Sequence, residues 1–150
     1  MARQLSRRET LTAGVSAFAA GLASAPRPAR ALNDYADQIK KFTGGKTPVE
    51  GRVKLELPEL AENGNTVPLS VAVDGRPGEG AHVQEILVVA PENPNARVIR
   101  FRFSALSVPE ASTRIRLAAT QDVIAVAKLS DGTFFSASRQ IKVTIGGCGG

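Results

Sequence analysis

The chain has 150 residues, which is enough for one ordinary domain but not for two full cores. Hydrophobic residues make up 43% and charged residues 22%, the balance of a folded globular protein. Aromatic residues make up only 5%, which disfavours a nucleic-acid binder that stacks bases on aromatic side chains. One histidine and one cysteine are too few for a zinc site with three or four nitrogen and sulfur ligands. We therefore expect no nucleic-acid partner, no metal and no other cofactor.

The net charge of +5 comes mostly from the first 31 residues. This segment holds five arginines and one glutamate, a net charge of +4. The remainder holds 14 basic and 13 acidic residues, a net charge of only +1. The body of the protein is therefore neither a polyanion binder nor an acidic tail.

An arginine pair, Arg7 and Arg8, precedes a short and weakly apolar run over residues 12–25. This arrangement resembles a twin-arginine signal peptide, and Ala29-Arg30-Ala31 offers a small-x-small cleavage site. The run is too short and too rich in glycine and alanine to span a membrane. We therefore expect residues 1–31 to be cleaved, leaving a periplasmic protein without a membrane anchor. The alternative is an amphipathic helix that belongs to the domain.

Residues 32–45 predict a short helix at the start of the mature chain. Tyr35, Ile39 and Phe42 recur at helical spacing, and Gly44 and Gly45 end the pattern.

From residue 47 onward the hydrophobic pattern has a period of two, which indicates β-strands. Two more continuous apolar runs, 83–90 and 123–129, predict central strands covered on both faces. Turn clusters rich in glycine, proline and asparagine separate the runs. Seven or eight short strands over residues 46–145 predict a mainly β fold, an immunoglobulin-like antiparallel β-sandwich. The expected strands are residues 53–57, 67–73, 83–90, 99–103, 114–117, 123–129, 133–137 and 140–145.

Two pairs of arginines, Arg100 with Arg102 and Arg114 with Arg116, alternate with apolar residues on the expected strands. Such a face is most often simply solvated, but it could also line a surface for an anion or a partner. His82 starts a strand and is interpreted as a surface residue. The acidic residues are scattered through turns, without the pairing that a two-carboxylate hydrolase needs. No catalytic residue is predicted.

The chain ends with Gly146-Gly147-Cys148-Gly149-Gly150, directly after the last expected strand. Glycine has the largest conformational freedom, so residues 146–150 predict a thin, flexible arm. The three residues from Ile145 to Cys148 give the thiol a reach of roughly 10 Å.

A single cysteine in an exported protein indicates intermolecular pairing or a free reactive thiol. No basic residue adjoins Cys148 to make it a strong nucleophile, so carrying a group suits it better than catalysis. A prenylation signal needs cysteine at the fourth position from the end, and here it is third. A C-terminal Gly-Gly can also carry sulfur as a thiocarboxylate, but that route requires ATP, which does not suit an exported protein.

Three segments and the twin-arginine leader together resemble the SoxY family, the sulfur-carrier subunits of the periplasmic thiosulfate-oxidising (Sox) system. The segments are ENGNTV at residues 62–67, APENPN at residues 90–95 and GGCGG at residues 146–150. The resemblance implies that Cys148 is a covalent carrier site and that Gly146, Gly147, Gly149 and Gly150 form its flexible arm.

The same resemblance implies a set of partners. They are a SoxZ-like subunit in a heterodimer, a c-type haem conjugating enzyme, a metallohydrolase and a molybdenum-haem sulfane dehydrogenase. These enzymes act in turn on the sulfur held by Cys148, so the protein itself is not an enzyme. The alternative is an exported β-sandwich that serves as a structural or interaction module and has an incidental C-terminal thiol.

Overall fold

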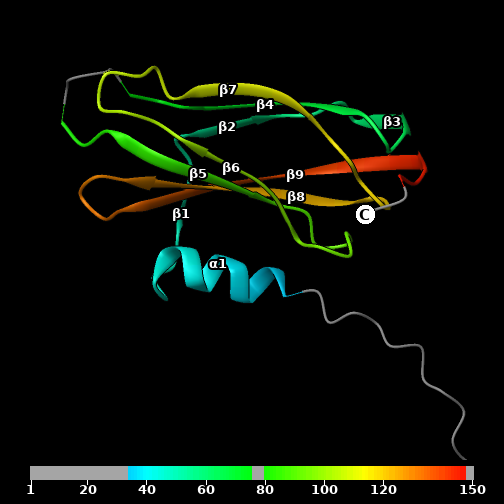
Figure 1. The fold of residues 1–150 in the computed structure, drawn as a ribbon, viewed down its shortest axis with the longest axis horizontal. Helices are drawn as coiled ribbons and strands as arrows, with labels where there is room; N and C mark the ends of the chain where they lie inside the picture. Colours follow the sequence, from blue (N-terminus) through cyan, green and yellow to red (C-terminus); the bar gives the residue numbers. More distant parts are fainter. Residues whose placement is uncertain (1–33, 76–79, 148–150) are drawn as a thin grey trace, which may run out of the picture. The chain divides into compact units, whose positions relative to one another are not determined.

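The computed structural model describes residues 34–75 and 80–147 (Figure 1). The expected signal peptide lies outside the described residues, and so do Cys148, Gly149 and Gly150. Within the described part, no helix is long and apolar enough to cross a membrane.

The expected N-terminal helix is present as α1 (Tyr35–Thr43). Gly44 follows it with a left-handed φ of 64°, which glycine adopts without steric cost, and the amide of Gly45 donates to the carbonyl of Lys40. The two glycines therefore end the helix as the sequence predicted.

The larger of two sheets has six strands, in the order β1-β9-β8-β5-β6, with β3 also paired to β9 (Figure 1). The two runs predicted as central strands are β5 and β8, which lie next to each other in this sheet. Its strands are β1 (Val49–Glu50), β3 (Leu60–Asn63), β5 (Val83–Val89), β6 (Arg97–Arg102), β8 (Gln121–Leu129) and β9 (Phe134–Ile145).

The smaller sheet has three antiparallel strands in the order β2-β4-β7. They are β2 (Val53–Glu56), β4 (Val67–Val73) and β7 (Glu110–Ile115). On β4 every second residue is buried, starting at Val67, which is the pattern of a strand with one face on the core.

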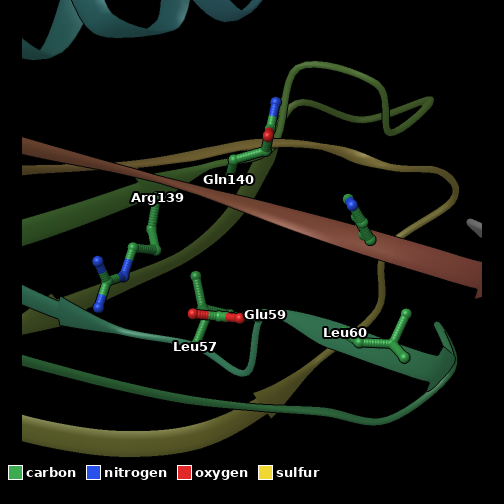
Figure 2. Close-up of a pocket in the computed structure, with 6 residues that line it drawn as sticks. Leu57, Glu59, Leu60, Arg139 and Gln140 are labelled. Atoms are coloured by element: carbon green, nitrogen blue, oxygen red, sulfur yellow. The ribbon is translucent and has the colours of Figure 1, made fainter.

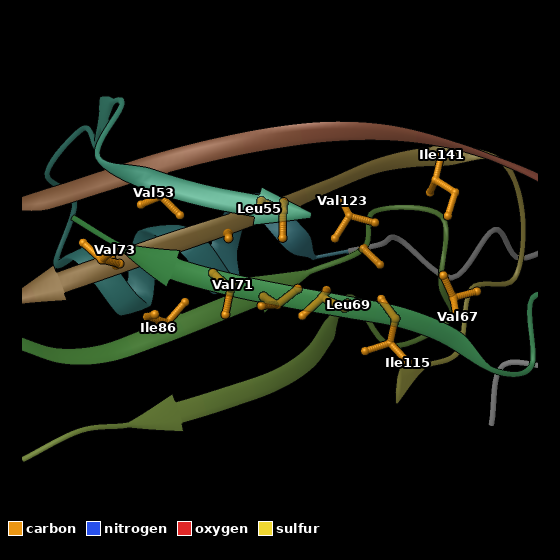
Figure 3. Packing of buried hydrophobic residues seen from close by; sticks show 14 of the residues in the cluster. Val53, Leu55, Val67, Leu69, Val71, Val73, Ile86, Ile115, Val123 and Ile141 are labelled. Atoms are coloured by element: carbon orange, nitrogen blue, oxygen red, sulfur yellow. The ribbon is translucent and has the colours of Figure 1, made fainter. Parts of the chain in front are cut away.

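The core lies between the two sheets and is built from aliphatic side chains (Figure 3). Both sheets contribute fully buried residues, such as Leu69 and Val71 from β4 and Ile86 and Ile141 from the larger sheet. The predicted β-sandwich is therefore confirmed.

Helix α1 covers the other face of the larger sheet. Leu87 and Val126 lie opposite each other in the β5–β8 register and are buried on that face, away from the core between the sheets. Phe42 packs edge-on against Phe134 of β9, with ring centroids 6.0 Å apart. The coverage by α1 explains why β5 and β8 are apolar on both faces.

Three expectations about the strands were wrong in detail. Residues 134–145 form one strand of 12 residues, β9, rather than two. The strand expected at 114–117 starts earlier, at Glu110, as β7. The sandwich is not purely antiparallel, because the short strands β1 and β3 both run parallel to β9.

Candidate functional site

Gly146 and Gly147 are the part of the C-terminal GGCGG segment that the structure describes. Both follow β9 directly, and Gly147 is buried against the sandwich rather than projecting from it. Consecutive Cα atoms are about 3.8 Å apart, so the position of Gly147 determines where the last three residues of the chain begin. We therefore take the surroundings of Gly147 as the candidate site.

Three backbone segments meet at this position through hydrogen bonds. The amide of Gly64, in the turn between β3 and β4, donates to the carbonyl of Ile145 at 2.7 Å. The amide of Leu117, in the loop between β7 and β8, donates to the carbonyl of Gly64 at 2.8 Å. The amide of Gly147 then donates to the carbonyl of Leu117, also at 2.8 Å. The base of the arm is thus bonded to a cradle made of Gly64, Leu117 and Ala118.

The cradle requires glycine because backbone atoms of neighbouring segments come too close to leave room for a side chain, and not because of an unusual φ angle. Neither Gly64, Gly146 nor Gly147 has a positive φ. A Cβ on Gly64 would overlap the carbonyl oxygen of Leu117 and lie 2.6 Å from the amide nitrogen of Gly147. A Cβ on Gly146 would overlap the carbonyl oxygen of Ala118, and one on Gly147 would lie 2.8 Å from the carbonyl oxygen of Gly64. Side chains at these positions would force the segments apart.

A buried polar network holds the β7–β8 side of the cradle in place. Asn93, only 9% exposed, donates to the carbonyl of Arg116 at 2.8 Å and accepts from the amide of Ala118 at 2.9 Å. Gln121, 5% exposed, donates to the side-chain oxygen of Asn93 at 3.2 Å and accepts from the amide of Glu92 at 2.9 Å. Buried amide groups need hydrogen-bond partners, and those of Asn93 and Gln121 find them in both loops. The network therefore links the β5–β6 loop to the β7–β8 loop.

The cradle gives a common location to segments that are far apart in the sequence. Gly64 belongs to ENGNTV and lies directly against Gly147. Asn93 belongs to APENPN and bonds Arg116 and Ala118, the two neighbours of the residue Leu117 that accepts from Gly147. The sequence analysis used these segments for the family resemblance but predicted no role for Gly64, Asn93, Leu117 or Gln121. The only hint in the sequence is Gly64 between two asparagines, and this pattern is typical of an ordinary turn.

The structure separates the two arginine pairs that the sequence singled out. Arg100 and Arg102 lie 3.6 Å and 3.1 Å from the carboxylate of Glu85, so their charge is compensated. Arg114 and Arg116 have no ion pair among the described residues, and they line a groove with Arg97. His82 lies just before β5 and uses its backbone amide and carbonyl to bond Ser130, which agrees with its interpretation as a strand-end residue.

A cavity of about 510 Å³ opens between the β2–β3 segment and β9 (Figure 2). Leu57, Glu59 and Leu60 lie on one side, and Arg139 and Gln140 lie on the other. The lining offers charges of both signs but no nucleophile and no histidine. We therefore assign no chemistry to this cavity.

The two clearly shifted pKa values lie outside the cradle. The pKa of Asp131, in the β8–β9 turn, is lowered because its carboxylate accepts hydrogen bonds from the hydroxyl and the amide of Thr133. The pKa of Lys54 is raised by its hydrogen bond and ion pair with Asp74. Over residues 34–75 and 80–147, no three histidine, cysteine or acidic side chains are grouped so that they could hold a metal. The cradle can thus position a chain terminus, but it contains no acid, base or nucleophile of its own.

Comparison with known proteins gives the family. The family model for SoxY, the sulfur oxidation protein, matches residues 39–148, so the match ends at Cys148. The structure of the sulfur carrier protein SoxY from Chlorobium limicola f thiosulfatophilum is similar, with a TM-score of 0.61 and 33% sequence identity. That alignment covers 73% of this chain and 96% of the Chlorobium chain. No curated protein matches the sequence.

Superoxide reductases share the fold at much lower identity. The enzyme from Ignicoccus hospitalis is 19% identical over 62% of this chain and 80% of its own, with a TM-score of 0.54. The enzyme from Nanoarchaeum equitans is 14% identical over 64% of this chain and 100% of its own, with a TM-score of 0.53. These likenesses show the architecture alone. On the family match and the Chlorobium structure, the chain belongs to the SoxY family of sulfur oxidation proteins.

Proposed function

We propose that this protein is a periplasmic sulfur carrier in thiosulfate oxidation and that it holds the intermediates covalently on Cys148. The observation that carries the proposal is the end of the chain: the one cysteine stands between two glycine pairs, directly after a residue bonded to the sandwich. Membership of the SoxY family supports it.

In the proposed cycle the Cys148 thiol is the point of covalent attachment for each intermediate. In the first step the Cys148 sulfur bonds to the outer sulfur of thiosulfate, and a proton and two electrons leave to a haem-containing partner. Water then cleaves the bond between this sulfur and the sulfonate, which releases sulfate and leaves a sulfane sulfur on the cysteine. Another partner then takes six electrons from that sulfane, and three water molecules supply the oxygens of the sulfonate that forms while the sulfur stays attached. A second hydrolysis releases sulfate and frees the thiol. Every intermediate is held on the cysteine sulfur, and every electron acceptor belongs to a partner.

The arm suits delivery into such partners. Gly146, Gly147, Gly149 and Gly150 place no side chain beside the sulfur, so the segment is thin enough for a narrow channel. We propose that the enzymes are the conjugating, hydrolysing and sulfane-oxidising members of the Sox system, and that a SoxZ-like subunit pairs with the sandwich in a heterodimer.

The substitution Cys148→Ser tests the carrier role. We expect the variant to abolish thiosulfate-dependent electron transfer in a system reconstituted with the partner enzymes. Its melting temperature should stay that of the native protein, because the exchange replaces one sulfur atom by an oxygen atom and leaves the aliphatic core between the sheets intact. Electron transfer at the native rate by Cys148→Ser would overturn the proposal.

Export is tested separately. We propose that the twin-arginine route delivers the protein and that cleavage follows Ala31. N-terminal sequencing of the periplasmic form should then begin at Leu32, whereas periplasmic protein that still begins at Met1 would contradict the cleavage.

A further inference from the structure

A groove of about 310 Å³ runs along the open side of the sandwich, beside the edge strands β6 and β7. Three arginines line it: Arg97 from β6, Arg114 from β7 and Arg116 just after β7. Asn93 and Asn95 of the β5–β6 loop also line it, and the rest of its lining is aliphatic. The groove therefore offers guanidinium and amide donors and no carboxylate.

The positive charge of this groove is uncompensated. Within residues 34–75 and 80–147, the ion pairs closer than 4.0 Å involve Lys54, Arg100 and Arg102, and none involves the three groove arginines. Like charges that line one groove repel each other unless an anion lies between them. Guanidinium groups bind oxoanions such as carboxylates and phosphates through paired N–H donors, and the tetrahedral sulfonate group presents similar oxygens.

The groove and the cradle share one loop. Arg116 lines the groove, and the next residue, Leu117, accepts the hydrogen bond from the amide of Gly147. Asn93 lines the groove and also bonds the backbone of Arg116 and Ala118. The base of the arm is thus bonded to the residue that directly follows Arg116.

We propose that Arg97, Arg114 and Arg116 form a site for a sulfonate oxoanion, and that its ligand is the sulfonate end of the group carried on Cys148. The inference rests on the proposed carrier function, because the sulfonate reaches the groove through the arm. Binding there holds the charged end of the thiosulfonate against the sandwich between visits to the partner enzymes. It also attracts anionic sulfur compounds to the thiol.

Tetrathionate provides a test that needs no partner enzyme. The Cys148 thiolate attacks an inner sulfur of this dianion, a sulfur–sulfur bond breaks, and thiosulfate leaves with its electron pair. The product is the thiosulfonate adduct itself. The neutral disulfide 4,4′-dithiodipyridine reacts with the same thiolate but carries no charge. The ratio of the two second-order rate constants cancels any change in the reactivity of the thiol and reports attraction of the anion alone.

We expect the triple variant Arg97→Gln/Arg114→Gln/Arg116→Gln to lower this ratio about fivefold at low salt, with the difference shrinking toward 1 M salt. The matched control is Arg100→Gln/Arg102→Gln, which also removes arginines but ones already paired with Glu85. The control should keep the native ratio. An unchanged ratio in the triple variant, or an equal fall in the control, would overturn the proposal.

A second measurement identifies the source of the sulfonate. Arginine Nε–H NMR signals of the groove should shift when tetrathionate loads the native protein, whereas the signals of the arginines that remain in the triple variant should not shift when that variant is loaded. Shifts that appear on titration of free thiosulfate into the unloaded protein, but not on loading of Cys148, would keep the oxoanion site but contradict its assignment to the carried group. Shifts in neither case would overturn the site. Tetrathionate loads the thiol chemically, without any partner enzyme. A negative result in these two measurements therefore contradicts the oxoanion site but not the carrier function. An absence of adducts on protein from cells contradicts the carrier function but not anion binding in the groove.

Discussion

Gly64 positions the base of the arm because it has no side chain. Its two backbone groups bond Ile145 and Leu117, and the amide of Gly147 lies where a Cβ on Gly64 would come. We expect Gly64→Ala to destabilise the sandwich by about 1–3 kcal/mol, because backbone atoms on both sides must move. The amide of Gly147 should also exchange its hydrogen faster.

Urea unfolding and amide hydrogen exchange measure these two effects. Gly75→Ala is the matched control, because Gly75 has no positive φ and its nearest neighbour is the end of the Arg52 side chain, 3.9 Å away. The control should change the free energy of unfolding by less than about 0.5 kcal/mol. If Gly64→Ala behaves like the control in both measurements, the cradle does not hold the arm.

At the scale of elements, Asn93 joins the β5–β6 loop to the β7–β8 loop. We expect Asn93→Ala to destabilise the protein by about 2–4 kcal/mol, since it leaves the carbonyl of Arg116 and the amide of Ala118 without this partner. Asn95→Ala in the same loop removes an exposed amide and should cost less than about 0.5 kcal/mol. Equal midpoints of thermal unfolding for the two variants would contradict the role of Asn93.

The strands were predictable where hydrophobic residues alternate, and less so where tertiary contacts decide. The period-two pattern identified β4, which has one buried face, and the continuous apolar runs identified β5 and β8, which are covered on both faces. It missed β1 and β3, which are short and exist because β9 offers them a parallel edge. It also divided β9, whose middle residues 138–140 are polar but stay paired to β8.

The site was only partly predictable for the same reason. The composition of GGCGG marks the end of the chain as unusual, and so the sequence predicts an arm over residues 146–150. Which of its glycines contact the sandwich depends on Gly64 and Leu117, both remote in sequence. The structure bonds Gly147 to the cradle, so while this bond persists the thiol has less than the roughly 10 Å reach expected from Ile145. The flexibility of the residues after Gly147 stays a prediction.

For the whole molecule, the proposed function makes the sandwich the support of one chemical group, the Cys148 thiol. The core between the sheets is aliphatic, and the uncompensated arginines lie beside the loop that holds the base of the arm. Under the proposed function, stability and sulfur transfer depend on different parts of the chain, because the core sets the free energy of unfolding and the thiol holds the sulfur group. Variants at Cys148 should therefore change sulfur transfer without changing the melting temperature.

The intact mass of the protein purified from cells that oxidise thiosulfate tests the central claim most directly. We predict masses above that of the free protein by the increments of thiosulfonate and sulfane groups. Fragmentation should map these groups to Cys148, and protein with Cys148→Ser from the same cells should show none of them. A native protein that carries only an unmodified thiol under these conditions, or adducts that persist in Cys148→Ser, would contradict the account.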